Sequence, residues 1–169
     1  MRKVSLVGIG QDVLDNELMA ILVNGDKDII GILLDNGANT EITNNFGKTA
    51  LIKASSFNNI EIIKLLLKYD ANINAVDKFG WTALIQAAEE GHVDIIELLL
   101  EKGAFINLTD IDGNTALMIA SSEGHPMVVK SLLKHGANST PTDEFGRNAL
   151  MKAAENGFSD IVDIIEKYS

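Results

Sequence analysis

The most regular feature of the chain is a dense apolar segment that occurs again one unit further on. The apolar positions of one copy are Ile60, Ile62, Ile63, Leu65, Leu66 and Leu67, and those of the next are Val93, Ile95, Ile96, Leu98, Leu99 and Leu100. Each segment is too apolar for a lone surface helix, so we predict helices that neighbours bury on more than one side. A shorter helix before each segment carries a small residue in register, at Ala54, Ala87, Ala120 and Ala153. The pattern predicts two short helices per unit.

Glycine-containing turns separate the predicted helix pairs. Their glycines are Gly47, Gly80, Gly113 and Gly146, and threonine follows two positions later at Thr49, Thr82 and Thr115. Successive turn glycines are about 33 residues apart, a period typical of helical repeats. At two further turns Asn58 and Asp70 stand where other copies have glycine. We expect both to keep the left-handed backbone, because Asn and Asp tolerate it best after glycine.

One unit matches a known repeat motif along its length. The motif runs Asp-x-x-Gly-x-Thr-Pro-Leu-His, then Ala-Ala, then Gly-His, and the matching residues are Asp77, Gly80, Thr82, Leu84, Ala87, Ala88, Gly91 and His92. Alanine replaces the proline of the motif in every copy, at Ala50, Ala83, Ala116 and Ala149. On these residues the chain resembles the ankyrin repeat family. The resemblance implies an all-α fold, an ankyrin-repeat solenoid of about five helix-turn-helix repeats with hairpin-like turns.

The resemblance covers residues 14–169, which we interpret as a single ankyrin-repeat domain after an N-terminal extension at residues 1–13. The predicted units are an N-terminal capping repeat at 14–43, full repeats at 44–76, 77–109 and 110–142, and a C-terminal capping repeat at 143–169. Terminal repeats need polar outer faces. We assign this role to Asp12, Asp15, Asn16 and Glu17 at one end and to Asp160, Asp163, Glu166 and Lys167 at the other.

Composition narrows the function classes. The chain has 14 Lys and Arg against 24 Asp and Glu, a formal net charge of −10. Nucleic acids and anionic membranes are bound mostly through clustered Lys and Arg, so we expect neither as a partner. The apolar run before Gln11 is too short for the core of a signal peptide, and no stretch approaches the length of a membrane span. We therefore expect a cytoplasmic protein.

Residues that could support catalysis or bind metal are few. The chain has no cysteine, which excludes thiol chemistry. His92 and His125 share one position in successive repeats, and stacked helices ~8–10 Å apart hold them too far apart for one zinc ion. We interpret these histidines as braces of the loop between the helices. Glu89 and Glu90 are adjacent on a helix and do not face each other. We predict no catalytic residue, no metal and no cofactor, and hence no enzyme.

The predicted binding residues follow from the resemblance. In ankyrin-like proteins the turn tips and the first helix of each repeat form a concave surface. On it we predict a partner-binding site of Phe46, Phe57, Phe79, Trp81, Lys78, Glu89, Glu90, Ile111, Asp112, Asn114, Glu123, Phe145 and Arg147. The aromatic members Phe46, Phe57, Phe79 and Trp81 are expected to converge on one patch. The alternative is that the turn phenylalanines only brace the hairpins.

The predicted function is a protein–protein interaction module that binds its partner on this surface. Hot spots of interfaces favour aromatic residues, and the rim of the surface is acidic. We therefore expect a protein or peptide with an apolar anchor followed by basic residues. The alternative is a self-associating structural or regulatory subunit, which would be a dimer where the first hypothesis predicts a monomer.

A second charge pattern is interpreted as structural. One helix position alternates in sign through successive repeats, at Lys64, Glu97, Lys130 and Asp163. We expect these residues to form a ladder of ion pairs between neighbouring repeats. Each exposed pair of this kind contributes about 0–1 kcal/mol, so the ladder would define register more than stability.

Overall fold

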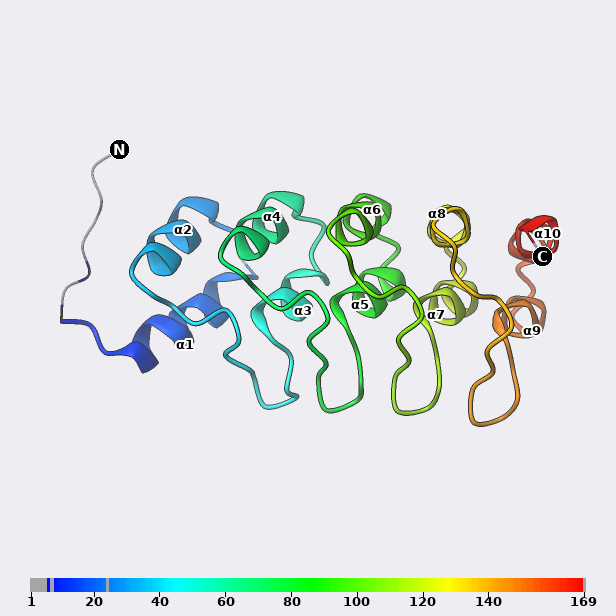
Figure 1. Ribbon diagram of the computed structural model, residues 1–169, viewed down its shortest axis with the longest axis horizontal. Coiled ribbons are helices and arrows are strands. Elements are labelled where there is room, and N and C mark those ends of the chain that lie inside the picture. Colours follow the sequence, from blue (N-terminus) through cyan, green and yellow to red (C-terminus); the bar gives the residue numbers. More distant parts are fainter. Residues whose placement is uncertain (1–5, 7, 24, 169) are drawn as a thin grey trace.

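The chain folds as a row of helix pairs. The computed structural model describes residues 6, 8–23 and 25–168, and within them it contains ten helices and no extended strand. The helices are α1 (Gln11–Ile21), α2 (Lys27–Asp35), α3 (Ala50–Ala54), α4 (Ile60–Lys68), α5 (Ala83–Glu89), α6 (Val93–Glu101), α7 (Ala116–Glu123), α8 (Pro126–Lys134), α9 (Ala149–Glu155) and α10 (Ser159–Tyr168). Successive pairs lie side by side, with odd-numbered helices in one layer and even-numbered helices in the other (Figure 1). The predicted all-α solenoid of helix pairs is confirmed.

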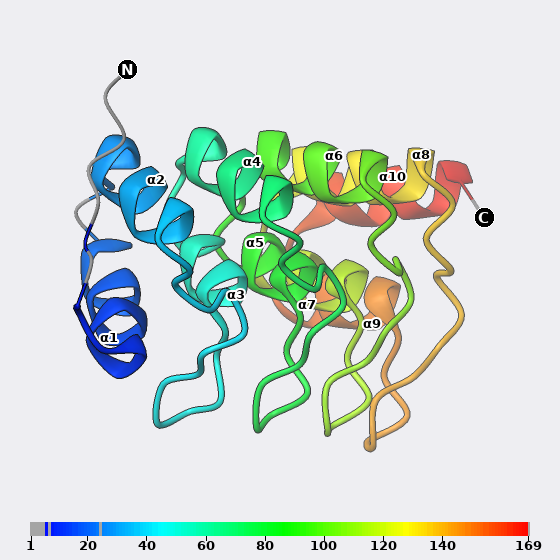
Figure 2. The same ribbon diagram turned by 60° about the vertical axis from the view of Figure 1, so that its left-hand side comes forward.

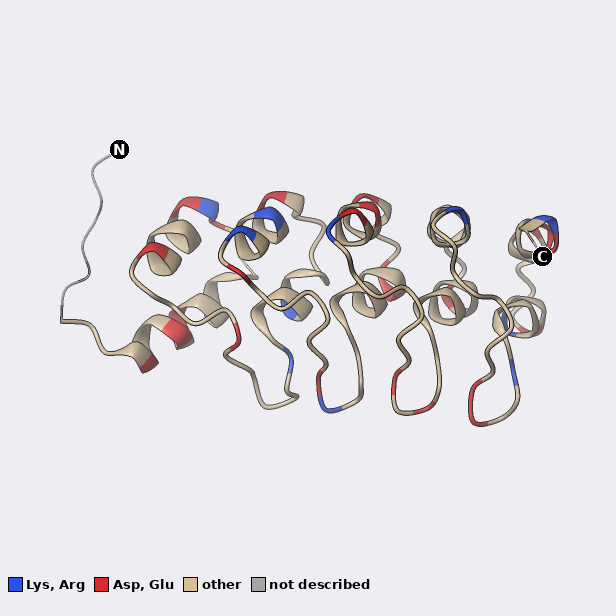
Figure 3. Cartoon of the chain, viewed as in Figure 1, with Lys and Arg blue, Asp and Glu red and all other residues tan. Residues whose placement is uncertain are grey.

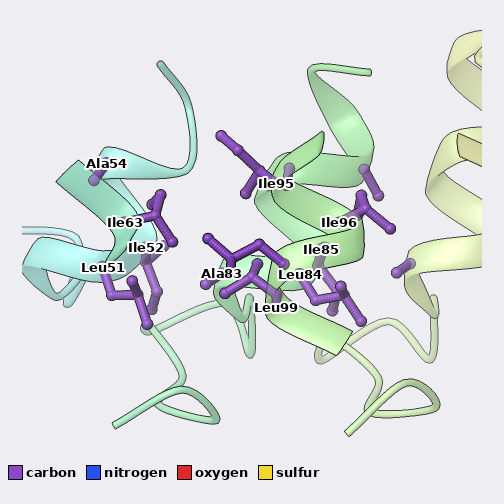
Figure 4. Packing of buried hydrophobic residues seen from close by; sticks show 14 of the residues in the cluster. Leu51, Ile52, Ala54, Ile63, Ala83, Leu84, Ile85, Ile95, Ile96 and Leu99 are labelled. Atoms are coloured by element: carbon purple, nitrogen blue, oxygen red, sulfur yellow. The ribbon is translucent and has the colours of Figure 1, made fainter. Parts of the chain in front are cut away.

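The hydrophobic core lies between the two layers and between neighbouring pairs. Ile63 of α4 and Ile96 and Leu99 of α6 are fully buried. Figure 4 shows these side chains, with Leu84 of α5, on the faces where neighbouring units meet. Burying one such side chain stabilises the fold by about 1.5–3 kcal/mol. The small residues of the odd-numbered helices are buried as well, at Ala54, Ala87, Ala120 and Ala153.

The threonine after each turn glycine begins the first helix of its unit. Oγ1 of Thr82 accepts a hydrogen bond from the main-chain N of Ile85 at 3.2 Å. Thr49 and Thr115 make the same bond at 3.4 and 3.3 Å. A threonine N-cap of this kind contributes about 1 kcal/mol to helix stability. In the last unit Asn148 is the N-cap of α9.

Long hairpins lead into α3, α5, α7 and α9 and project to the same side of the row (Figure 2). We name each hairpin by the helix that follows it. Main-chain hydrogen bonds join neighbouring tips, from Lys78 N to Phe46 O at 3.1 Å, from Ile111 N to Phe79 O at 3.0 Å, and from Glu144 N to Asp112 O at 3.0 Å. The turn glycines Gly47, Gly80, Gly113 and Gly146 all have positive φ. At Gly80 a Cβ would also lie 2.9 Å from Cα of Asp110, so the close stacking of tips requires glycine there.

Only one of the two predicted left-handed turn residues has that conformation. Asp70 has a φ of 60° and is the one non-glycine residue with positive φ in the described ranges. The prediction for Asn58 is therefore wrong. The reason is that α3 ends at Ala54. A turn with Ser55 in the right-handed region and a hydrogen bond from Phe57 N to Ala54 O then brings the chain to the α4 N-cap Asn59 without a left-handed residue.

The first helix begins earlier than the predicted domain boundary. α1 starts at Gln11, so a boundary at residue 14 would cut its first turn. Asp15 is buried, and its Oδ1 accepts hydrogen bonds at 2.7 Å from Asn39 N and from Gln11 Nε2. The assignment of Asp15 to a polar outer face is therefore wrong, because this carboxylate fixes α1 to the loop after α2. Residues 1–5 and 7 of the predicted extension lie outside the described residues.

The ladder of ion pairs between repeats is not formed. Within the described part of the chain Lys64 pairs with Glu61 of its own helix at 3.0 Å, and Glu61 lies 3.7 Å from Lys27 of the preceding unit. Glu97 instead accepts a hydrogen bond from Oγ of Ser131 at 3.4 Å. The prediction failed because Glu61, one turn before Lys64 on the same helix, pairs with that lysine, and Glu97 contacts Ser131 of the next repeat.

Candidate functional site

A cleft of about 420 Å³ opens at the tips of the α3, α5 and α7 hairpins. Its lining residues are Phe46, Lys48, Asp77, Phe79, Trp81, Glu89, Ile111 and Asp112. These residues come from three successive repeats. Hydrogen bonds between the tips hold the three hairpins in register. The cleft thus depends on the stacking of repeats and exists within no single one of them.

The outer wall of the cleft is apolar although it faces solvent. Phe46 is 59% exposed, Phe79 48% and Ile111 68%, while Trp81 is half-buried. Three of the four aromatic residues that were expected to converge therefore do so. Phe57 does not line the cleft, because it lies in the turn that leads from α3 away to α4.

A polar network around Gln86 of α5 lies next to the cleft and joins two of its lining residues, Lys48 and Glu89. Nζ of Lys48 lies 5.5 Å from the centre of the Trp81 ring and donates a hydrogen bond to Oε1 of Gln86 at 2.5 Å. Nε2 of Gln86 in turn donates to Glu89 at 2.7 Å and to Glu90 at 3.4 Å. Gln86 is buried and was not among the predicted binding residues. The sequence does contain a sign of it, because Gln86, Lys53 and Lys152 are polar residues at the same repeat position within otherwise apolar first helices.

Carboxylates make this end of the cleft electronegative. Burial raises the pKa of Glu89, and the nearby charges of Glu90 and Glu123 raise it further, against the lowering effects of Gln86 and Lys48. Glu90 and Glu123 are exposed. Figure 3 shows acidic residues on the hairpins that precede α5, α7 and α9. A cation that approached Glu89 would relieve this repulsion.

Asp77, like Lys48, lines the cleft and was not among the predicted binding residues. The residue is only 7% exposed, and its Oδ1 accepts hydrogen bonds from the main-chain N of Phe79 at 2.8 Å and of Trp81 at 2.9 Å. Its Oδ2 is buried and has no hydrogen-bond partner within the ranges described. The position is a known turn aspartate of the repeat motif, so the sequence indicated its structural role and gave no sign of the unpaired oxygen.

The equivalent aspartates of the next two hairpins are paired. Oδ2 of Asp110 accepts a hydrogen bond from Nδ2 of Asn114 at 3.1 Å. Oδ2 of Asp143 lies 2.8 Å from Nζ of Lys152 and 2.9 Å from a guanidinium nitrogen of Arg147. Burial by itself raises the pKa of Asp143, but hydrogen bonds from Lys152 and Arg147 outweigh it and hold this pKa well below its usual range.

These contacts indicate a structural role for Asn114 and Arg147, which were predicted to bind a partner. Asn114 is buried against Asp110, and Arg147 is held by Asp143 and by Glu155 at 3.6 Å. Both side chains complete their own hairpins. The prediction treated the position after each turn glycine as a tip that faces outward, whereas a donor at that position folds back onto the turn aspartate.

Four other predicted residues do not line the cleft, namely Lys78, Glu90, Glu123 and Phe145. Phe145 is 72% exposed and does not line it, and Arg147 lies over its ring at 5.0 Å. Lys78 is exposed and its Nζ donates a hydrogen bond to the main-chain O of Asn45 at 2.9 Å. Ile111 and Asp112, by contrast, line the cleft as part of the α7 hairpin.

The described residues contain neither a candidate metal centre nor a candidate membrane span. No group of three or more His, Asp or Glu side chains in them is arranged to hold a metal ion. None of their helices is both long enough and apolar enough to span a membrane. His92 and His125 lie in separate repeats, and each bonds a main-chain carbonyl of the preceding unit.

Paired helices in a row, with hairpins that project to one side, define a helical-repeat solenoid. A family model described as ankyrin repeats (3 copies) matches residues 18–110 and 106–168. The chain belongs to the ankyrin repeat family. Comparison with curated proteins gives no match. Ankyrin repeats are generally protein–protein interaction modules and are typically non-catalytic.

Proposed function

We propose that this chain binds a protein or peptide partner through the concave surface made by its hairpin tips and first helices, without catalysing a reaction. The observation that supports this most is the cleft, where Phe46, Phe79 and Ile111 expose large apolar side chains next to one another. Apolar side chains that gather on a surface mark interaction sites, whereas scattered ones need no explanation. Aromatic residues in such a patch also supply much of the binding energy of interfaces.

The chemistry of the lining supports binding over catalysis. Its titratable groups are the carboxylates of Asp77, Glu89 and Asp112 and the ammonium of Lys48. No hydroxyl or imidazole side chain lines the cleft, as far as the described residues go, so a nucleophile paired with a base is not at hand. Acyl transfer and phosphoryl transfer both require more than this set offers.

The charge of the lining indicates the partner. Three carboxylates face one ammonium group, and the chain as a whole is acidic. We infer a partner segment with an apolar anchor for Phe46, Phe79 and Ile111, next to basic residues. Salt weakens interactions between exposed charges, so affinity for this partner falls as ionic strength rises.

A display selection of peptides against the purified protein tests the proposal. The counter-screen uses a Phe79→Ala/Trp81→Ala double variant whose circular dichroism is unchanged. The matched control is Phe145→Ala, since Phe145 occupies the same tip position as Phe79 but lies outside the cleft. Peptides that bind the parent protein and the Phe145→Ala variant but do not bind the double variant support the proposal. Peptides that bind all three proteins equally well would contradict it.

Self-association is the competing outcome. If the exposed aromatic residues pair two copies, light scattering will detect a dimer whose fraction rises with protein concentration and that Trp81→Ala abolishes. Such a dimer would replace the proposed partner with a second copy of the chain. A constant monomer mass over the same range supports a separate partner.

A further inference from the structure

The α9 hairpin shows what the turn aspartate binds when a cation is supplied. The guanidinium of Arg147 lies 2.9 Å from Oδ2 of Asp143 and 5.0 Å from the centre of the Phe145 ring. It is therefore held by a carboxylate and by an aromatic face at once. Guanidinium groups suit this arrangement, since they donate hydrogen bonds in a plane and also stack on rings.

The α5 hairpin has the same carboxylate and the same aromatic residue but lacks the guanidinium. Asp77 corresponds to Asp143 and Phe79 to Phe145, while Trp81 stands where Arg147 stands. The indole of Trp81 donates no hydrogen bond to Asp77, and Oδ2 of Asp77 has no partner in the described structure. Leaving a buried carboxylate oxygen unpaired costs free energy.

A cation from the neighbouring repeat partly fills this place. Lys48 reaches over the Trp81 ring and donates to Gln86, which is in register with Lys152, the cation of helix α9 that pairs with Asp143. Its partner there is a neutral amide. The ammonium group makes no ion pair within the described residues, although the carboxylates of Asp77, Glu89 and Asp112 line the same cleft.

We propose that the cleft takes an arginine side chain of the partner, which displaces Lys48 from Trp81 and donates hydrogen bonds to Asp77. The inference rests on the proposed function and states which basic residue of the partner that surface recognises. The guanidinium stacks on Trp81 and Phe79 as Arg147 stacks on Phe145. Glu89 and Asp112 then balance its charge, and Ile111 contacts the apolar neighbour of the arginine in the partner.

Three small probes test the chemistry without knowledge of the partner. They are acetyl-leucyl-arginine amide, its lysine analogue, and its citrulline analogue, which has nearly the same shape and no charge. Trp81 is the only tryptophan of the chain, so its fluorescence reports the cleft directly. We expect the arginine probe to saturate the signal at the lowest concentration, the lysine probe at a higher one, and the citrulline probe to leave it unchanged. Equal responses to arginine and citrulline would overturn the inference.

Two variants assign the contacts. Asp77→Asn is expected to keep the turn, because Asn44 at the same position of the α3 hairpin accepts the equivalent two main-chain hydrogen bonds. This variant lowers the affinity for the arginine probe by about tenfold. Lys48→Met removes the resident cation and raises arginine affinity by about threefold. Lys78→Met is the control, since Lys78 is a nearby tip lysine outside the lining. Equal gains from both lysine variants would overturn the displacement of Lys48.

The outcomes separate this inference from the proposed function. Display binders that require Phe79 and Trp81 but contain no arginine, together with a silent arginine probe, leave the binding surface in place and overturn the arginine site. A saturating arginine probe that is lost in Asp77→Asn, in a chain that yields no display binders, supports the arginine site and counts against a peptide-binding surface.

Discussion

The imidazole of His125 hydrogen-bonds the main-chain carbonyl of Glu89, which lies one repeat earlier, at 2.8 Å from Nε2. A carbonyl oxygen only accepts, so Nε2 carries the proton. His92 makes the equivalent bond to the carbonyl of Ser56 at 3.3 Å. The two histidines therefore join the loop between the helices of one repeat to the end of the first helix of the repeat before. The interpretation of both as loop braces agrees with these bonds.

Replacing His125 with alanine is expected to weaken the coupling between the α5–α6 and α7–α8 units. The lost hydrogen bond should lower the free energy of unfolding by about 1–2 kcal/mol, as measured by urea titration. His135→Ala is the control, because the ring of His135 bonds Ser131 within its own repeat. An equal loss in both variants would show that His125 contributes no coupling between repeats.

Two turn glycines are expected to respond differently to alanine. Both Gly80 and Gly146 have positive φ, which disfavours alanine by about 1–2 kcal/mol. A Cβ at Gly146 would meet open space, whereas one at Gly80 would lie 2.9 Å from Cα of Asp110 in the next hairpin. We predict that Gly80→Ala lowers the free energy of unfolding by at least about 1 kcal/mol more than Gly146→Ala. Equal losses in chemical denaturation would mean that the hairpin tips are free to separate.

The fold was predictable because its signals repeat. Four copies of the turn motif and two copies of the dense apolar segment gave the helix pairs and their order, and single exceptions such as Asn58 did not alter the architecture. Local detail was less predictable. Asp15 is buried where it accepts a hydrogen bond from Asn39 N, a tertiary contact that leaves no pattern in the sequence.

The candidate site was predictable as a surface and not as a set of contacts. Repeat register brought Phe46 and Phe79 to one side, since equivalent positions in a solenoid must lie in a row, and Trp81 lies two residues after Phe79. Register cannot say whether the side chain at such a position points outward. Arg147 turns back to Asp143 because a buried carboxylate lies within reach, and only the atomic arrangement reveals that.

Acid is expected to destabilise the last repeat through Asp143. The pKa of this carboxyl is lowered by Lys152 and Arg147, so its contribution to stability is complete above the unfolded value of about 3.9 and is lost as the pH falls below it. We predict that Asp143→Asn lowers stability at pH 7 and flattens the fall of the unfolding free energy between pH 4 and pH 2. Denaturant titrations across this range measure both effects, and a variant slope equal to that of the parent would refute the assignment.

Glu89 should make arginine binding depend on pH. Burial raises its pKa in the free protein, with Glu90 and Glu123 adding to the effect and Lys48 and Gln86 opposing it. A bound guanidinium favours the ionised carboxylate, so the arginine probe should bind about threefold more weakly as the pH falls from 7 towards 4.5.

The variant Glu89→Gln separates this binding charge from a structural one. When a carboxyl has a raised pKa in the folded state, the free energy of unfolding of the protein falls as the pH rises through that pKa. The neutral glutamine side chain should therefore raise the melting temperature at pH 7. The same variant should bind the arginine probe more weakly at pH 7 and with less dependence on pH. Lys48, Asp77 and Asp112 also face the cleft. A variant that is more stable but binds the probe more weakly would indicate that the charge of Glu89 serves binding. A variant that loses both stability and affinity would indicate that Glu89 supports the fold.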